Sequence, residues 1–143
     1  MTETRIRALN ALIRLRKTEV EQARNALAAA LAEEQNAIAY TEAQKNRMKT
    51  EQAAANTGQV DFNDFCLWFP VGQEAIEHAQ EQQAIAEAST EQTRATLMKA
   101  NGALKAAETL LEQRLKEEKE RRAHREMAEI DDLSRRLKSS KFL

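Results

Sequence analysis

The chain has 143 residues and a formal net charge of −1 at pH 7, and 42% of its residues are hydrophobic while only 4% are aromatic. Alanine supplies much of that hydrophobic content, so few large side chains are present to fill a compact globular core. Ala, Glu, Gln, Lys, Arg and Leu dominate, which is typical of long helices and coiled coils and excludes a β-rich fold. We predict an all-α chain that forms one domain, a coiled-coil hairpin over residues 1–143.

The first predicted helix covers residues 3–56, approximately, and contains no proline or glycine. Its large apolar residues recur every seven positions, at Ile6, Ile13, Val20 and Leu27. This repeat is typical of a coiled coil. The step from Leu27 to Leu31 is four residues, which predicts a stutter in the heptad frame and a local unwinding of the supercoil.

Residues 57–72, TGQVDFNDFCLWFPVG, form a predicted non-helical elbow, because Gly58, Pro70 and Gly72 favour a chain reversal there. The large apolar residues of this elbow are its candidate protein-binding residues: Phe62, Phe65, Leu67, Trp68 and Phe69. Two helices cannot readily cover so many large side chains, so we expect some of their surface to be exposed. Capping of the coiled coil and binding of a partner, including self-association through the elbow, both stay open.

Two aspartates in the elbow, Asp61 and Asp64, could offer carboxylates to a magnesium ion, but capping of a short helical turn explains them more simply. Cys66 is the only cysteine, which rules out an intrachain disulfide. His78 and His124 are expected to be surface residues. With no phosphate-binding glycine loop and no nucleophile beside a histidine and an acid, we predict a non-enzyme with no catalytic residue, metal or cofactor.

The second predicted helix covers residues 73–139, approximately, with a heptad repeat at Leu97, Leu104 and Leu111. Antiparallel folding about the elbow would place Ile6 to Leu31 opposite Leu97 to Ile130. The second helix is the longer one, so it is expected to extend past the start of the first.

Charge is distributed unevenly along the chain. Residues 1–24 and 110–143 together hold 16 basic and 11 acidic residues, whereas residues 25–109 hold 6 and 12. This separation predicts an oriented partner for the basic end of the hairpin. The candidate residues for that contact are Arg5, Arg7, Arg14, Arg16, Arg121, Arg122, Arg125, Arg135 and Arg136. Nucleic acid is disfavoured as a partner, because glutamates alternate with these basic residues.

The start of the chain, MTETRIRALNALIRLRK, is charged throughout and does not read as a signal peptide. The longest apolar run, Ala26 to Ala32, is far shorter than the roughly 20 residues that span a bilayer. We therefore expect a cytoplasmic protein.

Two segments carry a resemblance to a known family. The opening RIRALNALIRLRKTEVEQARNALAAALAEE and the closing RRAHREMAEIDDLSRRLKSS, with its Asp131, Asp132, Leu133, Arg135 and Arg136, resemble the two ends of flagellar FliJ proteins. The resemblance covers nearly the whole chain. It implies a stalk in the flagellar type III export apparatus, similar to the YscO-like proteins of injectisomes and to the paired terminal helices of the gamma subunit of rotary ATP synthases.

In that role the chain would bind a hexameric export ATPase and promote its assembly and activity, at the cytoplasmic face of the inner membrane. It would also contact the export gate membrane protein or export chaperones. An alternative is a prefoldin-like holdase that grips unfolded chains through the elbow, although the strands that assemble such proteins are missing. A regulator of the polymerase channel, with Asp61 and Asp64 at its tip, is the least favoured reading.

Overall fold

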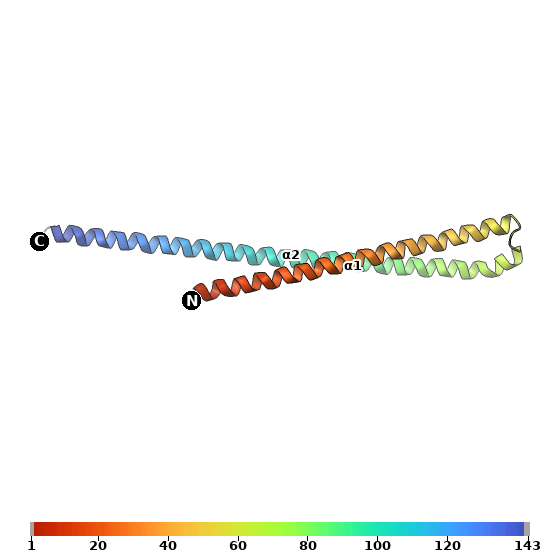
Figure 1. Cartoon of the computed structure of the whole chain (residues 1–143), viewed down its shortest axis with the longest axis horizontal. Helices are drawn as coiled ribbons and strands as arrows, with labels where there is room; N and C mark the ends of the chain where they lie inside the picture. The colour runs from red at the N-terminus through yellow and green to blue at the C-terminus, as the bar shows by residue number, and fades with distance from the viewer. Residues whose placement is uncertain (1, 142–143) are drawn as a thin grey trace. The chain divides into compact units, whose positions relative to one another are not determined.

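Two long α-helices make up nearly all of residues 2–141, which are the residues that the computed structural model describes (Figure 1). Helix α1 (Thr2–Asn56) has 55 residues and helix α2 (Phe62–Lys141) has 80. Within the described residues there is no strand. The predicted fold class, two long helices packed against each other as a hairpin, is confirmed. None of these helices has an apolar stretch long enough to cross a membrane.

The connection between the helices is shorter than predicted. Only residues 57–61 lie outside the helices, so the expected non-helical elbow over 57–72 is wrong in its extent. The predicted cap does form: Asn63 N donates to Asp61 Oδ1 at 3.4 Å, and Asp64 lies in the first turn of α2. Pro70, which was expected to favour the chain reversal, lies inside α2. The helix that Asp61 caps therefore continues through the proline.

The end of α1 is a glycine cap. Gly58 has a φ of 80°, a left-handed conformation that glycine adopts without the strain of a Cβ atom. Gln59 N then donates to Ala54 O at 3.0 Å, which satisfies a carbonyl that the ending helix would leave free. The predicted reversal at Gly58 is thus a local hydrogen-bonded turn.

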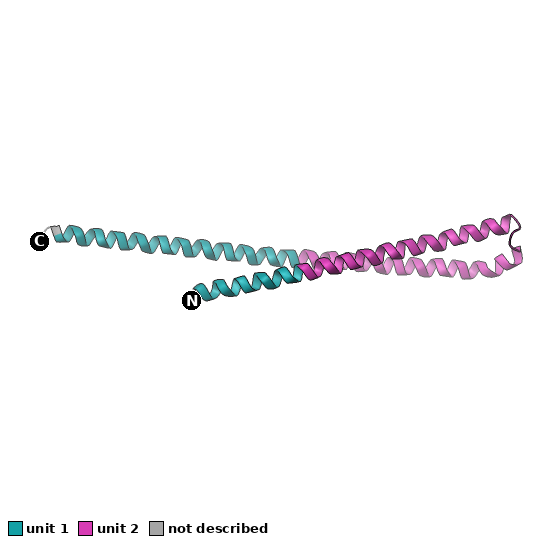
Figure 2. Ribbon diagram, viewed as in Figure 1, with its two compact units in different colours: residues 1–20, 100–143 teal, residues 21–99 magenta. Residues whose placement is uncertain are grey.

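The chain divides into two compact units (Figure 2), of which unit 2 comprises residues 21–99. Its α1 and α2 segments run antiparallel and meet along a seam of small side chains, with Ala23, Ala30 and Ala79 buried. Thr41 and Thr90 are also buried, and each hydroxyl shares its one hydrogen between a carbonyl of its own helix and one across the seam. Thr41 Oγ1 lies 3.0 Å from Ala37 O and 3.2 Å from Ala79 O, and Thr90 Oγ1 lies 3.1 Å from Ala86 O and 3.3 Å from Ala30 O. Hydroxyls can reach a facing backbone only where helices approach closely, so the small residues account for these bonds.

The two hydroxyl bonds define the register of unit 2. The sequence separation between Ala30 and Thr41 on α1 equals the separation between Ala79 and Thr90 on α2. The antiparallel register is therefore the same at both hydrogen bonds. Thr90 occupies the place opposite Ala30, whereas the sequence pattern placed Leu97 opposite this part of α1. At this point the expected register is therefore wrong by about one heptad, because the connection is shorter than the predicted elbow.

The heptad frame of α1 does not slip. Side chains with reduced exposure recur in alternating steps of three and four residues from Ile6 to Ala55. After Leu27 the next seam position is Ala30, which is buried, so the heptad frame does not depend on Leu31. The predicted stutter followed large side chains only, and here a small residue holds the seam position.

Unit 1 comprises residues 1–20 with 100–143 (Figure 2). Larger side chains form its seam: Ile13, Val20 and Ala107 are buried, and Leu104 and Leu111 are partly buried. Thr2 and Ile6 line a small cleft with Arg114 and Glu118, so Ile6 does not lie opposite Ile130 as expected. From residue 119 to residue 140 every side chain is exposed.

Candidate protein-binding surfaces

Three of the predicted elbow residues pack against one another at the start of α2. The ring of Phe65 lies 6.2 Å from that of Trp68 and 5.8 Å from that of Phe69, in tilted arrangements that favour aromatic contact. The Arg47 guanidinium from α1 lies over the Trp68 ring, 5.5 Å from its centroid. These three rings are partly buried. They therefore pack against one another and, through Arg47, against α1.

Gly72 explains the position of the tryptophan. It is buried, and a Cβ atom placed on it would lie 2.7 Å from Trp68 Cη2 and 3.0 Å from Met48 Cε. The absence of a side chain thus lets the six-membered ring of Trp68 approach Gly72 while Met48 approaches from α1. The sequence pattern treated Gly72 as a turn residue, whereas its role is packing.

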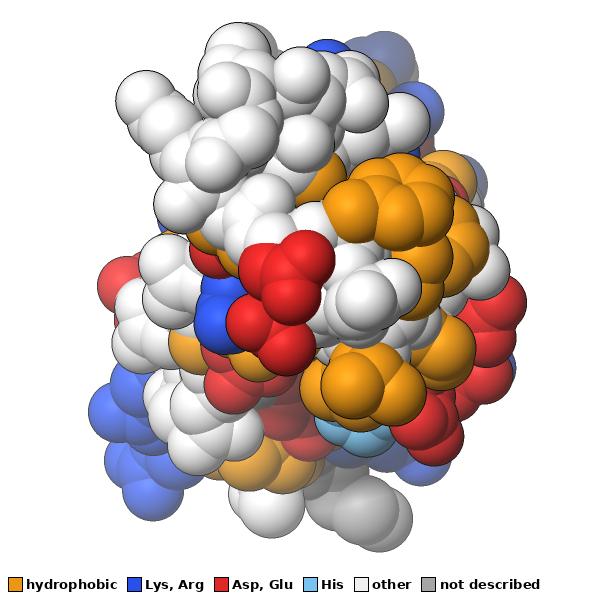
Figure 3. Space-filling view, turned by 90° about the vertical axis from the view of Figure 1, so that its right-hand side faces the viewer, with side chains coloured by type: hydrophobic (Ala, Val, Ile, Leu, Met, Phe, Trp, Pro, Cys, Tyr) orange, Lys and Arg blue, Asp and Glu red, His pale blue; other side chains and the backbone are white. Residues whose placement is uncertain are grey.

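The other elbow residues face outward. Phe62 and Leu67 are 64% and 78% exposed, and Val71, which the sequence reading missed, is 61% exposed. Figure 3 shows hydrophobic side chains gathered on the end of the molecule that carries the connection. Except for Asn63 and Asp64, residues 62–71 are apolar on every side of the helix, a pattern usual for a helix that is covered all round. We call Phe62, Leu67 and Val71 the turn face.

Acidic residues follow the turn face along α2. No lysine or arginine occurs from residue 61 to residue 93. The carboxylates of that stretch are Asp61, Asp64, Glu74, Glu77, Glu81, Glu87 and Glu91. A partner for the turn face would therefore combine apolar and basic side chains.

The predicted arginines all lie in unit 1. Three are held in ion pairs along their own helix: Arg16 with Glu19 at 2.9 Å, Arg121 with Glu118 at 3.8 Å, and Arg136 with Asp132 at 3.3 Å. The remaining six are exposed and lie outside the ion pairs of the described residues: Arg5, Arg7, Arg14, Arg122, Arg125 and Arg135. The structure brings Arg5 and Arg121 together, because both line the cleft at the start of α1.

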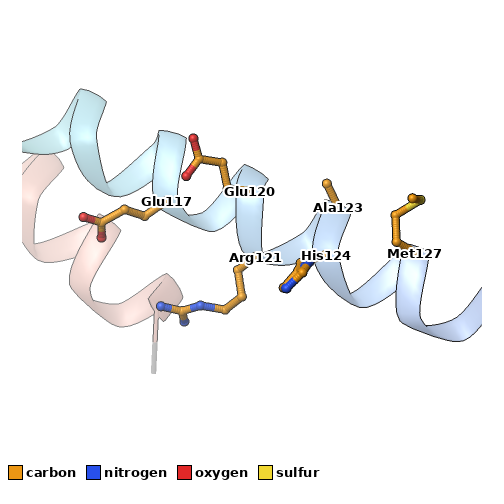
Figure 4. A pocket seen from close by; sticks show the side chains of 6 residues that line it. All are labelled: Glu117, Glu120, Arg121, Ala123, His124 and Met127. Atoms are coloured by element: carbon orange, nitrogen blue, oxygen red, sulfur yellow. The ribbon is translucent and has the colours of Figure 1, made fainter.

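An apolar stripe runs along the end of α2. Met127, Ile130, Leu133 and Leu137 are each more than half exposed. The α2 positions that face α1 include Ala107, Leu111 and Glu118. With the same heptad spacing, the next positions on this face are Arg121 and Arg125. Met127 follows Arg125 by two positions, which is about 200° around a helix. The stripe is thus on a different face from the seam, and Figure 4 shows Arg121 extending toward the start of α1 while Met127 projects away from it.

Chemistry-bearing groups are sparse. Within residues 2–141 no three His, Cys, Asp or Glu side chains are placed to hold a metal ion, and the Cys66 thiol is free and exposed. His124 lines only an open hollow on α2, beside Glu120 and Met127 (Figure 4). The candidate sites are therefore three surfaces that a protein could bind: the turn face, the exposed arginines and the apolar stripe.

A comparison with protein families decides between the possible kinds of helical hairpin. The family described as Flagellar FliJ protein matches residues 5–141. The chain belongs to the flagellar FliJ family. This confirms the resemblance of its two ends, and it makes this FliJ-family chain a component of the flagellar export apparatus. Neither a curated protein nor a solved structure was found to match it.

Proposed function

We propose that the chain is a non-enzymatic stalk of the flagellar export apparatus, which binds the hexameric export ATPase and promotes its assembly and activity. The binding element is the part of unit 1 that carries the candidate arginines and the apolar stripe. The observation that carries this proposal is the end of α2: from residue 119 to residue 140 it has no buried side chain, yet it presents Met127, Ile130 and Leu137 on one face. A regular apolar stripe without a cover favours a helix-binding partner.

Charge supports the same end of the molecule. The exposed arginines of unit 1 give a partner with acidic surface a way to orient the hairpin before the apolar stripe is covered. We place the complex at the cytoplasmic face of the inner membrane, where an export gate membrane protein would be in reach.

Steady-state ATP hydrolysis by the cognate export ATPase tests this proposal. A variant with Arg14, Arg121, Arg122 and Arg125 changed to Glu should lose most of the stimulation that the natural chain gives, while its helical content stays unchanged. The matched control reverses four exposed basic residues of unit 2: Arg24, Lys49, Arg94 and Lys99. It alters the net charge equally and should keep the stimulation. Full stimulation by the unit 1 variant would overturn the assignment.

The turn face is proposed as a second contact, for the export gate or for export chaperones. Changing Leu67 and Val71 to Asp should abolish binding to that partner, because both exposed apolar side chains would be replaced by charged ones that cannot form an apolar contact. Trp68 and Phe69, although they are candidate residues too, are poorer test positions, since their loss would also disturb the packing with Phe65. A variant that binds gate and chaperones normally would contradict this contact.

The exposed turn face also favours one alternative, a prefoldin-like holdase. That function predicts suppression of aggregation of an unfolded client, lost when Leu67 and Val71 become Asp. The export stalk predicts no such suppression. An aggregation assay with a model client separates the two.

A further inference from the structure

The seam of unit 2 repeats itself after one heptad. Thr41 donates to Ala79 O and Thr90 donates to Ala30 O in the observed register. One heptad further along the facing helices stand Ala86 and Ala37, which are again alanines. If α2 moved by seven residues toward the connection, both hydroxyls would meet equivalent carbonyls beside equally small side chains.

Larger side chains obey the same repeat. Met48 approaches Gly72 in the observed register and would lie opposite Ala79 after the displacement. Ala30, now opposite Thr90, would lie opposite Leu97. Most layers of unit 2 thus still combine one larger and one small side chain, which is the condition for close packing of two helices, whereas Gln44 would meet Gln83 and Glu51 would meet Ile76. The seam of unit 2 alone hardly distinguishes the two registers. In unit 1 the displaced register would place Arg114 opposite the buried Ile13, which favours the observed register.

The start of α2 fits the displaced register in its own way. If the displaced helix still began level with the end of α1, it would lose its first two turns and begin at about Pro70. Proline is well suited to the first helical position, where its missing N–H has no partner to lose. In the observed helix Pro70 lies further in, where it cannot donate to Cys66 O and its ring crowds that carbonyl.

We propose that unit 2 is a two-register device, which exchanges the observed pairing for one displaced by a heptad as residues 62–69 leave the helix and α2 restarts at Pro70. The packing of Phe65 on Trp68 and Phe69, with Arg47 over the indole, holds the observed register as the major one. The same aromatic side chains are therefore packed in the helix in one register and carried by a longer connection in the other.

Disulfide trapping tests the device in the full chain, with Cys66 changed to Ser. Gln44 lies opposite Ile76 in the observed register and would lie opposite Gln83 in the displaced one. Seven residues are about 10 Å of helix, and a disulfide needs Cα atoms within about 7 Å, so each pair reports one register. The mismatched control pairs Gln44 with Gln80. Along α2, Gln80 is nearer than Gln83 to Ile76, but its side chain is exposed and does not lie in the seam.

The measurement is the rate of intramolecular disulfide formation in a glutathione buffer. With Gln44→Cys in every variant, Gln83→Cys should react at about 0.1–10% of the rate of Ile76→Cys, as a minor state does, and well above the rate of Gln80→Cys. Adding Pro70→Ala should slow the Gln83→Cys pair several-fold and leave the Ile76→Cys pair unchanged. Equal rates for the Gln83→Cys and Gln80→Cys pairs, or no effect of Pro70→Ala, would overturn the proposal.

Discussion

At the scale of single residues, the structure depends on side chains that are small or absent. Ala30 and Ala79 let α1 and α2 approach until a threonine hydroxyl on one helix bonds a backbone carbonyl on the other. Gly72 lets the six-membered ring of Trp68 approach closely. Such positions contribute little buried apolar area, and their effect is to set how the helices meet.

Thr41→Val should therefore destabilise the protein by about 1 kcal/mol, the net value of one buried hydrogen bond, because valine keeps the shape and removes the hydroxyl. Thr96 provides the control, since it is exposed and its hydroxyl bonds only Gln92 O in its own helix. Urea unfolding followed by circular dichroism measures both variants. Equal losses in the two would mean that the bond to Ala79 adds nothing across the seam.

Two glycines in α2 offer a second matched pair. Alanine is the better helix former by about 1 kcal/mol, and at Gly102 a Cβ meets no atom within 4 Å, so Gly102→Ala should stabilise the protein. At Gly72 the Cβ would displace Trp68, and Gly72→Ala should lose about 1–3 kcal/mol of packing and end up less stable than the natural chain. Thermal unfolding decides, and a gain at Gly72 comparable to that at Gly102 would show that the indole moves freely.

At the scale of the elements, the sequence predicted two helices, the end of the first near residue 56 and the cap at Asp61. It misplaced the start of α2, because Pro70 and Gly72 both resemble turn residues, while one lies within the helix and the other is a packing site. It also found the aliphatic seam positions Ile13 and Val20 but missed Thr41 and Thr90. Periodicity of large side chains carries no signal for a seam built from Ala and Thr.

The same limits apply to the candidate surfaces. The aromatic content of the sequence predicted a partner-binding surface at the start of α2. It could not predict that Trp68 is partly buried while Leu67 is exposed, because the exposure of these side chains depends on how α1 packs. The apolar residues near Ile130 were read as part of the hairpin seam. Only the observed register shows that α1 does not cover them.

An element-scale prediction follows for the end of α2. Residues 119–140 are exposed on all sides, so their helical hydrogen bonds should open locally. Their amide hydrogens should therefore exchange about tenfold faster, or more, than the amide hydrogens of residues 76–104. Hydrogen–deuterium exchange read by mass spectrometry measures this. In the presence of the export ATPase, the stalk proposal predicts protection of residues 119–140. Equal protection of the two segments in the free protein would indicate that self-association already covers the stripe.

At the scale of the whole molecule, the chain has two kinds of surface with different chemistry. Unit 1 carries the candidate arginines and the apolar stripe, and unit 2 carries the turn face with a long acidic stretch behind it. Surfaces of opposite charge on one chain favour two different partners over two copies of the same one. Membership of the FliJ family places the chain itself in flagellar export.

The most direct test of the stalk account is the stoichiometry of the complex with the export ATPase. Native mass spectrometry with ATP analogue present should show one copy of this chain for each ring of six ATPase subunits, because one hairpin placed centrally excludes a second. The four-arginine variant of unit 1 should leave the ring without its stalk. One copy bound to every ATPase subunit, or no complex with a folded ATPase ring, would contradict the account.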